Sequence, residues 1–410
     1  MAISTDVDNA LKRFYSKTYE HMQYENNVLL GMLKKQFGCG GDKFYQTVSY
    51  GAGAGQSATF GTAQGVSTTL SKRKRFALGY GKHYAIGKVD NDAIRQSQND
   101  ASAVVRILSD EIMATMRKAT DCTEWDLFGD GYGTVGSIGS NTGATITLAR
   151  VSDALNFDVG STYNLATSAT AASLLDSGAT GTVIGVNANT GVVTFAAAVA
   201  TTWPSIANGQ TIHRAGDKLT ATMLKTPGLA AWLPTTAPTT TDFTGEDRSV
   251  DSRLYGRIVS GTGKAVRDTV LELATGIAAQ GGTPRIALLN YETFLKMQME
   301  YENKTIADTV PAVGEGGKNV AGVFYNGFKI AGPKGAITVL SATKCPSDRL
   351  YVLQPDTWTV PVVGKELFQN TLSGSGIVMD NEATDSVEFR RLFQGTLSCS
   401  APGWNGVATV

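Results

Sequence analysis

The sequence is poor in charge, and its charges cancel. Its 410 residues include 36 Lys or Arg and 36 Asp or Glu, so charged residues make up 18% of the chain, compared with about 25% in an average globular domain. Proteins that bind free nucleic acid usually carry a basic excess, because neutralised phosphates supply their affinity. The neutral balance therefore argues against a dedicated nucleic-acid-binding protein, and the 46 glycines favour β-rich structure with shared surfaces.

Cysteine and histidine are scarce and scattered. The four cysteines form no Cys-x-x-Cys pair, and the three histidines stand far apart, so the sequence predicts neither a metal site nor a cofactor. We expect reduced thiols and hence a reducing compartment. The N-terminus lacks the layout of a signal peptide, and no apolar run approaches the ~18 residues of a membrane span. The expectation is a soluble intracellular chain with no membrane partner.

Catalytic motifs are absent as well. The chain contains no Gly-x-Ser-x-Gly, His-Glu-x-x-His or Gly-x-x-x-x-Gly-Lys-[Ser/Thr] sequence. The glycines of 51–55 resemble a dinucleotide-binding loop, but no helical pattern follows them and they lie between two predicted strands. The sequence therefore predicts that the protein is not an enzyme, and an active site within residues 217–365 is the alternative.

A long charged segment, residues 90–128, contains neither proline nor glycine. Apolar or small residues recur in it at helical spacing, at Ile94, Ala101, Val104, Val105, Leu108, Ile112, Met116 and Ala119. At about 1.5 Å per residue the helix would be roughly 55–60 Å long, with Asp90 as its N-cap. The pattern predicts a strut helix within residues 89–131, and an ordinary long surface helix is the alternative.

The N-terminal segment, residues 1–37, carries large apolar side chains at helical spacing ahead of any predicted core. They include Leu11, Phe14 and Tyr15. Either a neighbouring subunit or the rest of the chain has to cover them. The sequence predicts an N-terminal arm and leaves both sources of cover open.

Residues 38–88 have the alternating pattern of two β-strands. Apolar residues alternate with polar ones at Phe44, Val48 and Tyr50, and again at Phe76, Leu78, Tyr80, Tyr84 and Ile86. An uncharged, glycine-rich stretch between them, which contains Phe60, predicts a flexible tip. A free two-stranded arm is marginal in water, so we expect the hairpin to lie on another copy of the chain.

Four consecutive basic residues begin the second strand of this hairpin: Lys72, Arg73, Lys74 and Arg75. Charged side chains of this kind can keep an exposed strand edge from aggregating. The other interpretation is a contact with an acidic patch on the next subunit. Both interpretations remain open.

The rest of the chain divides into a β-rich block and a mixed region. Residues 132–216 contain five charged side chains, and their short apolar runs alternate with turn residues such as 189–191, which predicts a small inserted β-barrel or sandwich. In 217–365 we expect a helix near 264–280, a strand at 285–289 and a helix that begins after Asn290. Further strands are expected at 328–330, 337–340, 350–353, 358–363 and 386–398. The fold class is α+β.

This order of parts resembles the major capsid proteins of tailed bacteriophages. The resemblance is carried by residues 72–92, which lead into the long helix, by PRIALLNYETFLKM (284–297), by DRLYVLQPDTWTVPVVGKELF (348–368) and by the closing EFRRLFQGTLS. It covers nearly the whole chain apart from 132–216. It implies an N-terminal arm (1–37), an extended hairpin loop (38–88), the spine helix of a peripheral domain (89–131), an axial α/β domain (217–365) and a return to peripheral strands (366–410).

The resemblance also implies a function and partners. Pentamers and hexamers of the chain would form a virion shell in the host cytoplasm and enclose double-stranded DNA without sequence-specific binding. A portal protein would join the shell, and a separate scaffolding protein is expected because the chain begins almost at the arm. Subunit contacts are expected at Phe60, Lys72, Arg73, Lys74, Arg75 and Phe76 of the hairpin and at Leu11, Phe14 and Tyr15 of the arm.

Two questions remain open within this resemblance. An encapsulin-type nanocompartment shell, which has a similar fold, is the alternative function. The block 132–216 is expected either to decorate or brace the outer surface of the shell, or to contact an adjacent capsomer.

Overall fold

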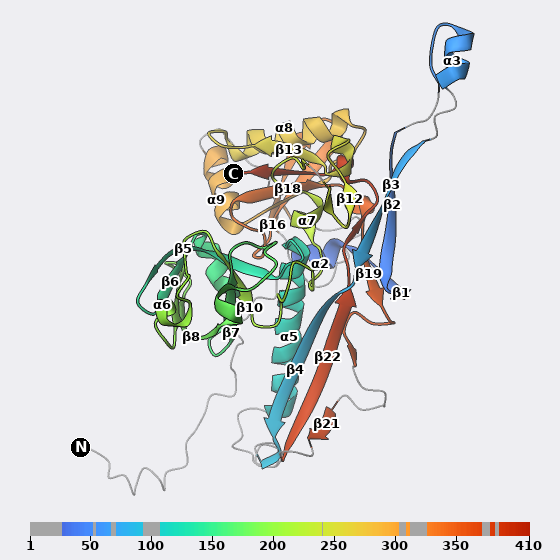
Figure 1. Cartoon of the computed structure of the whole chain (residues 1–410). Helices are drawn as coiled ribbons and strands as arrows, with labels where there is room; N and C mark the ends of the chain where they lie inside the picture. The colour runs from blue at the N-terminus through green and yellow to red at the C-terminus, as the bar shows by residue number, and fades with distance from the viewer. Residues whose placement is uncertain are drawn as a thin grey trace, which may run out of the picture. The chain divides into compact units, whose positions relative to one another are not determined.

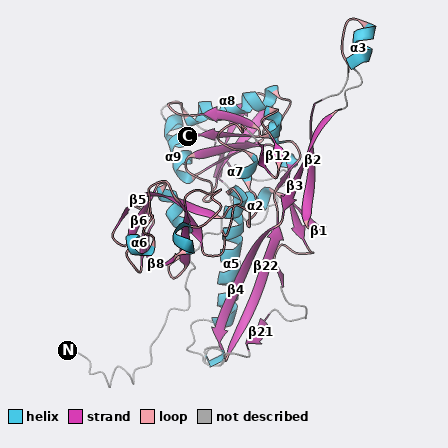
Figure 2. Cartoon of the chain, in the orientation of Figure 1, coloured by secondary structure: helices cyan, strands magenta, loops and turns pink. Residues whose placement is uncertain are grey.

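The computed structural model of the chain describes residues 27–51, 55–66, 71–92, 107–239, 241–302, 309–311, 326–370, 378–381 and 385–410. The chain divides into two compact units. Unit 1 comprises Met1–Glu25, Tyr84–Cys122 and Phe368–Leu392, and unit 2 comprises Asn26–His83, Thr123–Leu367 and Phe393–Val410. Figure 1 labels the elements, and Figure 2 colours them as helix or strand.

Unit 1 contains the first part of the long helix and strands from two distant parts of the sequence. Helix α5 (Ile107–Phe128) begins in this unit. Strand β22 (Ser386–Gly395) pairs with β4 (Gly81–Asp90), β20 (Gln369–Asn370) and β21 (Val378–Asn381). Gly87 allows the close packing here, because a methyl group at this position would lie 2.1 Å from Cζ of Phe389.

The predicted long helix is confirmed over residues 107–128. Within its predicted apolar stripe, Ile112 and Met116 are half-buried and Ala119 is buried. Positions 94, 101, 104 and 105 of the stripe lie outside the described residues. The second half of α5 departs from the expected charged surface, because Asp121, Glu124 and Asp126 are buried.

A seven-stranded mixed sheet forms the core of the α/β part of unit 2. Its strand order is β13-β24-β18-β14-β17-β16-β15, with bounds Arg257–Ser260, Gly406–Thr409, Arg349–Leu353, Ile286–Leu289, Gly335–Ser341, Asn326–Gly332 and Thr309–Pro311. Helices α8 (Val266–Ala279) and α9 (Tyr291–Glu302) pack on this sheet. The predicted apolar face of α8 is confirmed, since Val270, Leu273 and Ile277 are fully buried. Asn290 also caps α9 as predicted, because its Oδ1 accepts the N–H of Glu292 at 3.1 Å.

The β-rich block forms a closed barrel, so the barrel is correct and the sandwich is wrong. The strands follow the order β10-β5-β6-β9-β8-β7, with bounds Thr211–Arg214, Thr134–Thr142, Thr145–Leu148, Val192–Phe195, Thr180–Asn187 and Thr162–Ala166. Trp203 fills the barrel core, where it packs edge-on against Phe195, and its Nε1 donates to the carbonyl of Ala179 at 2.8 Å. A closed barrel has no free sheet edge, so this part completes its own backbone hydrogen bonding.

The predicted hairpin is present, with two differences. Strands β2 (Lys43–Gly51) and β3 (Lys72–Gly79) pair in antiparallel register. A short helix, α3 (Phe60–Val66), lies in the stretch for which the sequence predicts a flexible tip. The return strand ends at Gly79, and Tyr84 and Ile86, which the sequence places on it, belong to β4, which pairs with β22.

A short N-terminal helix and strand complete unit 2. Helix α2 (Val28–Met32) is held by Glu124 of α5, whose carboxylate accepts the N–H groups of Leu29 at 2.8 Å and Leu30 at 2.7 Å. Strand β1 (Lys34–Cys39) then pairs in parallel with β19 (Trp358–Val363), a pairing that the sequence does not predict. Among the described residues, no helix has both the length and the apolar character needed to cross a membrane.

Candidate assembly surface

The base of the hairpin packs on its own chain through Phe76. This side chain is fully buried. Its ring centroid lies 5.2 Å from that of Trp232 in α7 (Leu229–Trp232) and 5.9 Å from that of Phe243 in β11 (Thr241–Phe243). Burying a phenylalanine side chain contributes about 2 kcal/mol. This aromatic cluster (Phe76, Trp232 and Phe243) therefore fixes the base of the hairpin to the body of unit 2.

Two polar contacts lie beside the aromatic cluster. Nζ of Lys74 donates to Oε2 of Glu246 in β12 (Glu246–Asp247) at 2.9 Å, and this hydrogen bond raises the pKa of Lys74. The hydroxyl of Ser398 donates to Oε1 of Gln46 at 2.8 Å. Because Lys74 and Glu246 keep about a quarter of their side-chain surface exposed, their pair contributes less than about 1 kcal/mol. The main effect of the Lys74–Glu246 pair is to position strand β3 against β12.

These contacts correct two expectations. The expectation that the hairpin lies on another copy of the chain is wrong for its base, because residues more than 150 positions later in the same chain complete the aromatic cluster. The expectation that Phe76 contacts another subunit is wrong for the same reason, since its side chain is fully buried. Lys74 binds Glu246 of its own chain, which neither interpretation of the basic residues includes.

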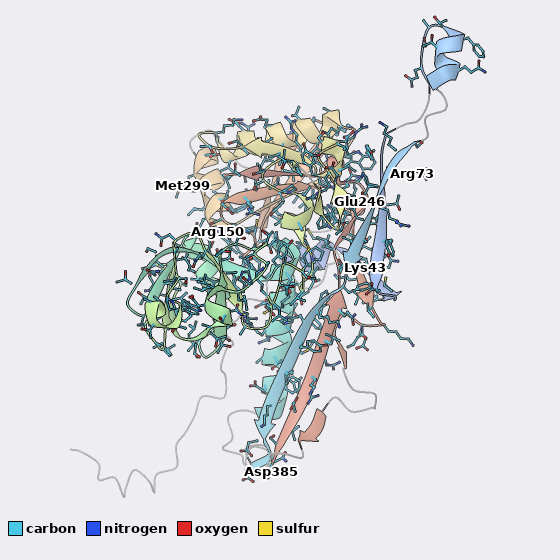
Figure 3. All side chains as sticks on the ribbon, in the orientation of Figure 1. Lys43, Arg73, Arg150, Glu246, Met299 and Asp385 are labelled. Carbon is cyan, nitrogen blue, oxygen red and sulfur yellow. The ribbon has the colours of Figure 1, made fainter. Side chains whose placement is uncertain are left out.

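The outer face and the tip of the hairpin are exposed. Lys72, Arg73 and Arg75 are all exposed, and the Arg75 guanidinium lies over the ring of Tyr45, 5.1 Å from its centroid. Figure 3 shows Arg73 on this hairpin. Phe60, the first residue of α3, is 80% exposed. These residues remain candidates for a subunit contact, whereas the arm residues Leu11, Phe14 and Tyr15 lie outside the described residues.

The barrel contacts the α/β part of unit 2 through Arg150. Its Nε donates to Oδ2 of Asp153 at 3.0 Å, and its Nη1 donates to Oδ1 of Asp348 at 2.8 Å. Beside this contact the hydroxyl of Ser152 donates to that of Ser347 at 3.2 Å. Burial raises the pKa of Asp153 to about 6, although the Arg150 guanidinium acts in the opposite direction. One guanidinium thus joins the two parts.

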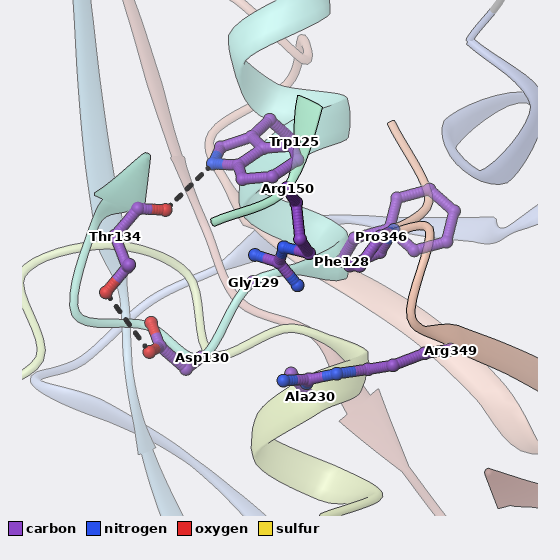
Figure 4. Close-up of a pocket in the computed structure, with 9 residues that line it drawn as sticks. All are labelled: Trp125, Phe128, Gly129, Asp130, Thr134, Arg150, Ala230, Pro346 and Arg349. Atoms are coloured by element: carbon purple, nitrogen blue, oxygen red, sulfur yellow. Dashed lines mark hydrogen bonds between the residues drawn. The ribbon is translucent and has the colours of Figure 1, made fainter. Parts of the chain in front are cut away.

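A cavity of about 90 Å³, open to solvent, lies at this junction (Figure 4). Its lining residues are Trp125, Phe128, Gly129, Asp130, Thr134, Arg150, Ala230, Pro346 and Arg349. Burial raises the pKa of Asp130, while its carboxylate accepts the N–H of Tyr132 at 2.9 Å and the hydroxyl of Thr134 at 3.3 Å. The carboxylate of Asp130 is therefore already hydrogen-bonded to groups of its own loop.

The chemistry of the cavity does not amount to a catalytic site. Its lining offers a single carboxyl and no His, Cys or Ser, so it lacks the paired acid and base or the activated nucleophile that catalysis needs. Burial also raises the pKa of the Cys399 thiol to about 12, which keeps it protonated and unreactive. In the described part of the chain, no group of three or more His, Cys, Asp and Glu side chains is placed to hold a metal ion.

This chain matches known proteins by structure and not by sequence. No family model matches the sequence, and no curated protein matches it. A chain of the cyanophage A-1(L) capsid asymmetric unit is 13% identical, with a TM-score of 0.54, and the match covers 98% of this chain and 97% of that one.

Two further solved structures match over similar lengths. One is the capsid of a native GTA particle, with 9% identity, a TM-score of 0.48, and 100% of this chain and 98% of that chain covered. The other is the SrpI encapsulin complex from Synechococcus elongatus, with 6% identity, a TM-score of 0.46, and 100% and 95% covered. Of these three structures, the cyanophage chain has a TM-score above 0.5, so it is the one whose fold is compared with that of this chain.

The cyanophage match spans nearly all of both chains. It therefore extends over the hairpin, the long helix and the α/β sheet together, in the order that the sequence predicts. The chain has the capsid-protein fold of tailed bacteriophages.

Proposed function

We propose that the chain is the major capsid protein of a tailed bacteriophage. Many copies would close into an icosahedral shell of pentamers and hexamers around double-stranded DNA. The observation that carries this proposal is the capsid fold, which extends over 98% of the chain in the comparison with the cyanophage capsid chain. The function is then physical, because the shell forms by burial of surface between copies and no bond is made or broken.

The exposed tip of the hairpin is the part of the chain that would contact a neighbouring subunit in this shell. Phe60 is 80% exposed in a single copy, and a side chain of this kind gains about 2 kcal/mol when a neighbour covers it. Each copy gives its tip to one neighbour and receives a tip from another, and such a head-to-tail contact closes into a ring when the rotation allows it. Many weak contacts of this kind add up in a closed assembly.

The charge balance of the chain suits an enclosing role. The formal net charge is zero, so the wall would not bind packaged DNA strongly through its phosphates. A portal protein and a separate scaffolding protein complete the proposal. Assembly takes place in the host cytoplasm, and the shell then becomes part of the virion.

Electron microscopy of the purified chain tests the proposal directly. Closed shells are expected, either from the chain alone or with a co-expressed scaffolding protein. A chain that stays monomeric under every assembly condition would contradict it. Shells that enclose a co-purifying enzyme in place of DNA would favour the nanocompartment alternative.

A deletion tests the role of the hairpin tip. Removing residues 52–68 is expected to abolish shells while the far-UV circular dichroism and the thermal unfolding of the remaining chain stay close to those of the full chain. This separation is expected because the aromatic cluster and the barrel lie outside the deleted stretch. Shells of normal size from the deleted chain would remove the tip from the assembly contact.

A further inference from the structure

A second, much smaller hairpin, β11–β12, lies against the base of the β2–β3 hairpin. Its two strands form a sheet of their own, which no other described strand joins. Phe243 of β11 packs on Phe76 with ring centroids 5.9 Å apart, and Glu246 of β12 accepts the hydrogen bond of Lys74 at 2.9 Å. The turn between the two strands contains Thr244 with a φ of 52°, a conformation that a β-branched residue keeps only where the surrounding structure fixes it. The β11–β12 hairpin is therefore a fixed support beside the base.

Glycines at both ends of the β2–β3 hairpin put little constraint on its direction. Gly40 and Gly41 precede β2, and Gly79 is the last residue of β3. At each of the three positions, no described atom lies within 4 Å of the place that a methyl group would occupy. Glycine also adopts a wide range of backbone conformations. The contacts that direct the hairpin are therefore those that its strands make with the body of unit 2.

The contacts between the hairpin and the body lie at two levels along the strands. Gln46, which binds Ser398, pairs across the ladder with Phe76, so these residues form the first level. Lys74 lies two residues closer to the tip and, because side chains alternate along a strand, on the same face as Phe76. Within the described chain, its bond to Glu246 is the hydrogen bond to the body that lies nearest the tip. One level alone permits rotation, whereas two levels fix a direction.

We propose that Glu246 is a positioning residue, which sets the direction of the hairpin tip and through it the angle between neighbouring copies in the shell. The first level is held mainly by the aromatic cluster, and apolar packing has little directional preference. The hydrogen bond from Lys74 to Glu246 requires a defined distance and angle, so it limits rotation about that cluster. This inference rests on the proposed function, because the angle between copies exists only in a shell.

The length of the strands makes the tip sensitive to this hydrogen bond. Gly51, the last residue of β2, lies five residues beyond Gln46, or about 17 Å at ~3.3 Å per residue. A rotation of about 10° around the first level would move Gly51 by about 3 Å, the length of a hydrogen bond, and the tip by more. Head-to-tail contacts repeat the same rotation from copy to copy. A shift at each contact would therefore change the curvature of the whole shell.

A charge swap tests the positioning role. Glu246→Lys places two cations side by side, so the hairpin is expected to turn and the shells to lose the uniform diameter of the parent shells in electron micrographs. Adding Lys74→Glu restores the pair with its charges exchanged, and the uniform diameter is expected to return. Glu272→Lys is the matched control, because it breaks an exposed pair with Lys264 on α8 and is expected to leave the diameter unchanged. Glu246→Lys shells of uniform parental diameter, or a swap that restores nothing, would overturn the inference.

Hydrogen exchange of the unassembled chain measures how firmly the hairpin is held without the shell. The amides of residues 72–79 are expected to exchange about threefold to fivefold faster in Glu246→Lys than in the parent chain, and to return to the parental rate in the charge swap. Faster exchange with unaltered shells would overturn the inference and leave the proposed function standing. Unchanged exchange with altered shells would also overturn it, because Glu246 would then act on a neighbouring copy. Failure of the parent chain to form any shell would contradict the proposed function, and the inference with it.

Discussion

Arg150 Nη1 lies 2.8 Å from Asp348 Oδ1, across the junction between the barrel and the α/β sheet. The same guanidinium reaches Asp153, whose side chain is 1% exposed. Burial disfavours the charge of Arg150, but the two carboxylates outweigh this effect and raise its pKa. Arg150 thus links the buried carboxylate of Asp153 in the barrel to the partly exposed carboxylate of Asp348 beside the sheet.

Removing this group is expected to destabilise unit 2. Arg150→Ala leaves the buried carboxylate of Asp153 without its cation, and loss of one partner of a buried ion pair costs about 3 kcal/mol. The free energy of unfolding, measured by urea titration, should fall by this amount. Arg253→Ala is the control, because Arg253 is 52% exposed in its pair with Asp251 and an exposed pair contributes about 0–1 kcal/mol. Equal losses in the two variants would show that Arg150 does not join the two parts.

A buried histidine predicts how stability depends on pH. Nζ of Lys225 donates to Nδ1 of His83 at 3.0 Å and lies 3.5 Å from Asp126 and 3.3 Å from Asp217. Burial lowers the pKa of His83 from 6.5 to about 4, the positive charges of Lys225 and Arg214 act in the same direction, and Asp126 and Asp217 oppose them. The folded chain therefore excludes a proton that the unfolded chain binds between pH 6.5 and 4.

This difference in proton binding decides whether stability rises or falls with pH. The stabilising contribution of neutral His83 is fully present above pH 6.5 and is lost as the pH falls toward 4. His83→Gln removes the titration, so its loss of unfolding free energy between pH 7 and pH 4.5 should be smaller than that of the parent chain by about 2–3 kcal/mol. His213, whose pKa burial also lowers to about 4, remains in both chains and provides the common background. Identical pH profiles would show that folding does not lower the pKa of His83.

Close packing of two strands predicts a strict requirement for glycine in unit 1. A methyl group at Gly87 would meet Phe389 at 2.1 Å, so Gly87→Ala forces the ring to move and should cost about 1–3 kcal/mol. Adding Phe389→Leu to Gly87→Ala should recover part of this loss. Gly79→Ala is the control, because no atom lies within 4 Å of a methyl group there. Thermal unfolding of the three variants checks the order, and a Gly87→Ala chain as stable as the Gly79→Ala chain would contradict it.

The parts that the sequence predicts well are those that depend on local pattern. The spacing of Val270, Leu273 and Ile277 predicts the buried face of α8, and the turn residues of 132–216 predict the β-rich block. Such patterns work because the period of the apolar residues is set by the element itself.

The parts that the sequence misses depend on distant residues. Glu124 has the pattern of a solvent-facing residue on a charged helix, yet it is buried because the N–H groups of α2 need an acceptor. The partner of Phe76 is hidden for a similar reason, since Trp232 and Phe243 come from short elements far along the chain. Local pattern carries no information about which distant side chain completes a contact.

Substitutions of two hairpin phenylalanines distinguish packing of the hairpin within its own chain from its contact with a neighbouring copy. Phe76→Ala removes a ring from the fully buried aromatic cluster and should lower the free energy of unfolding by about 3–5 kcal/mol. Phe60→Ala removes a ring that is 80% exposed, so the unfolding free energy should change by less than about 0.5 kcal/mol. If neighbouring copies cover the tip, Phe60→Ala should nevertheless reduce the yield of shells seen by electron microscopy and size-exclusion chromatography. A Phe60→Ala chain that assembles as well as the parent would show that α3 contacts its neighbour without this side chain, or that it makes no contact at all.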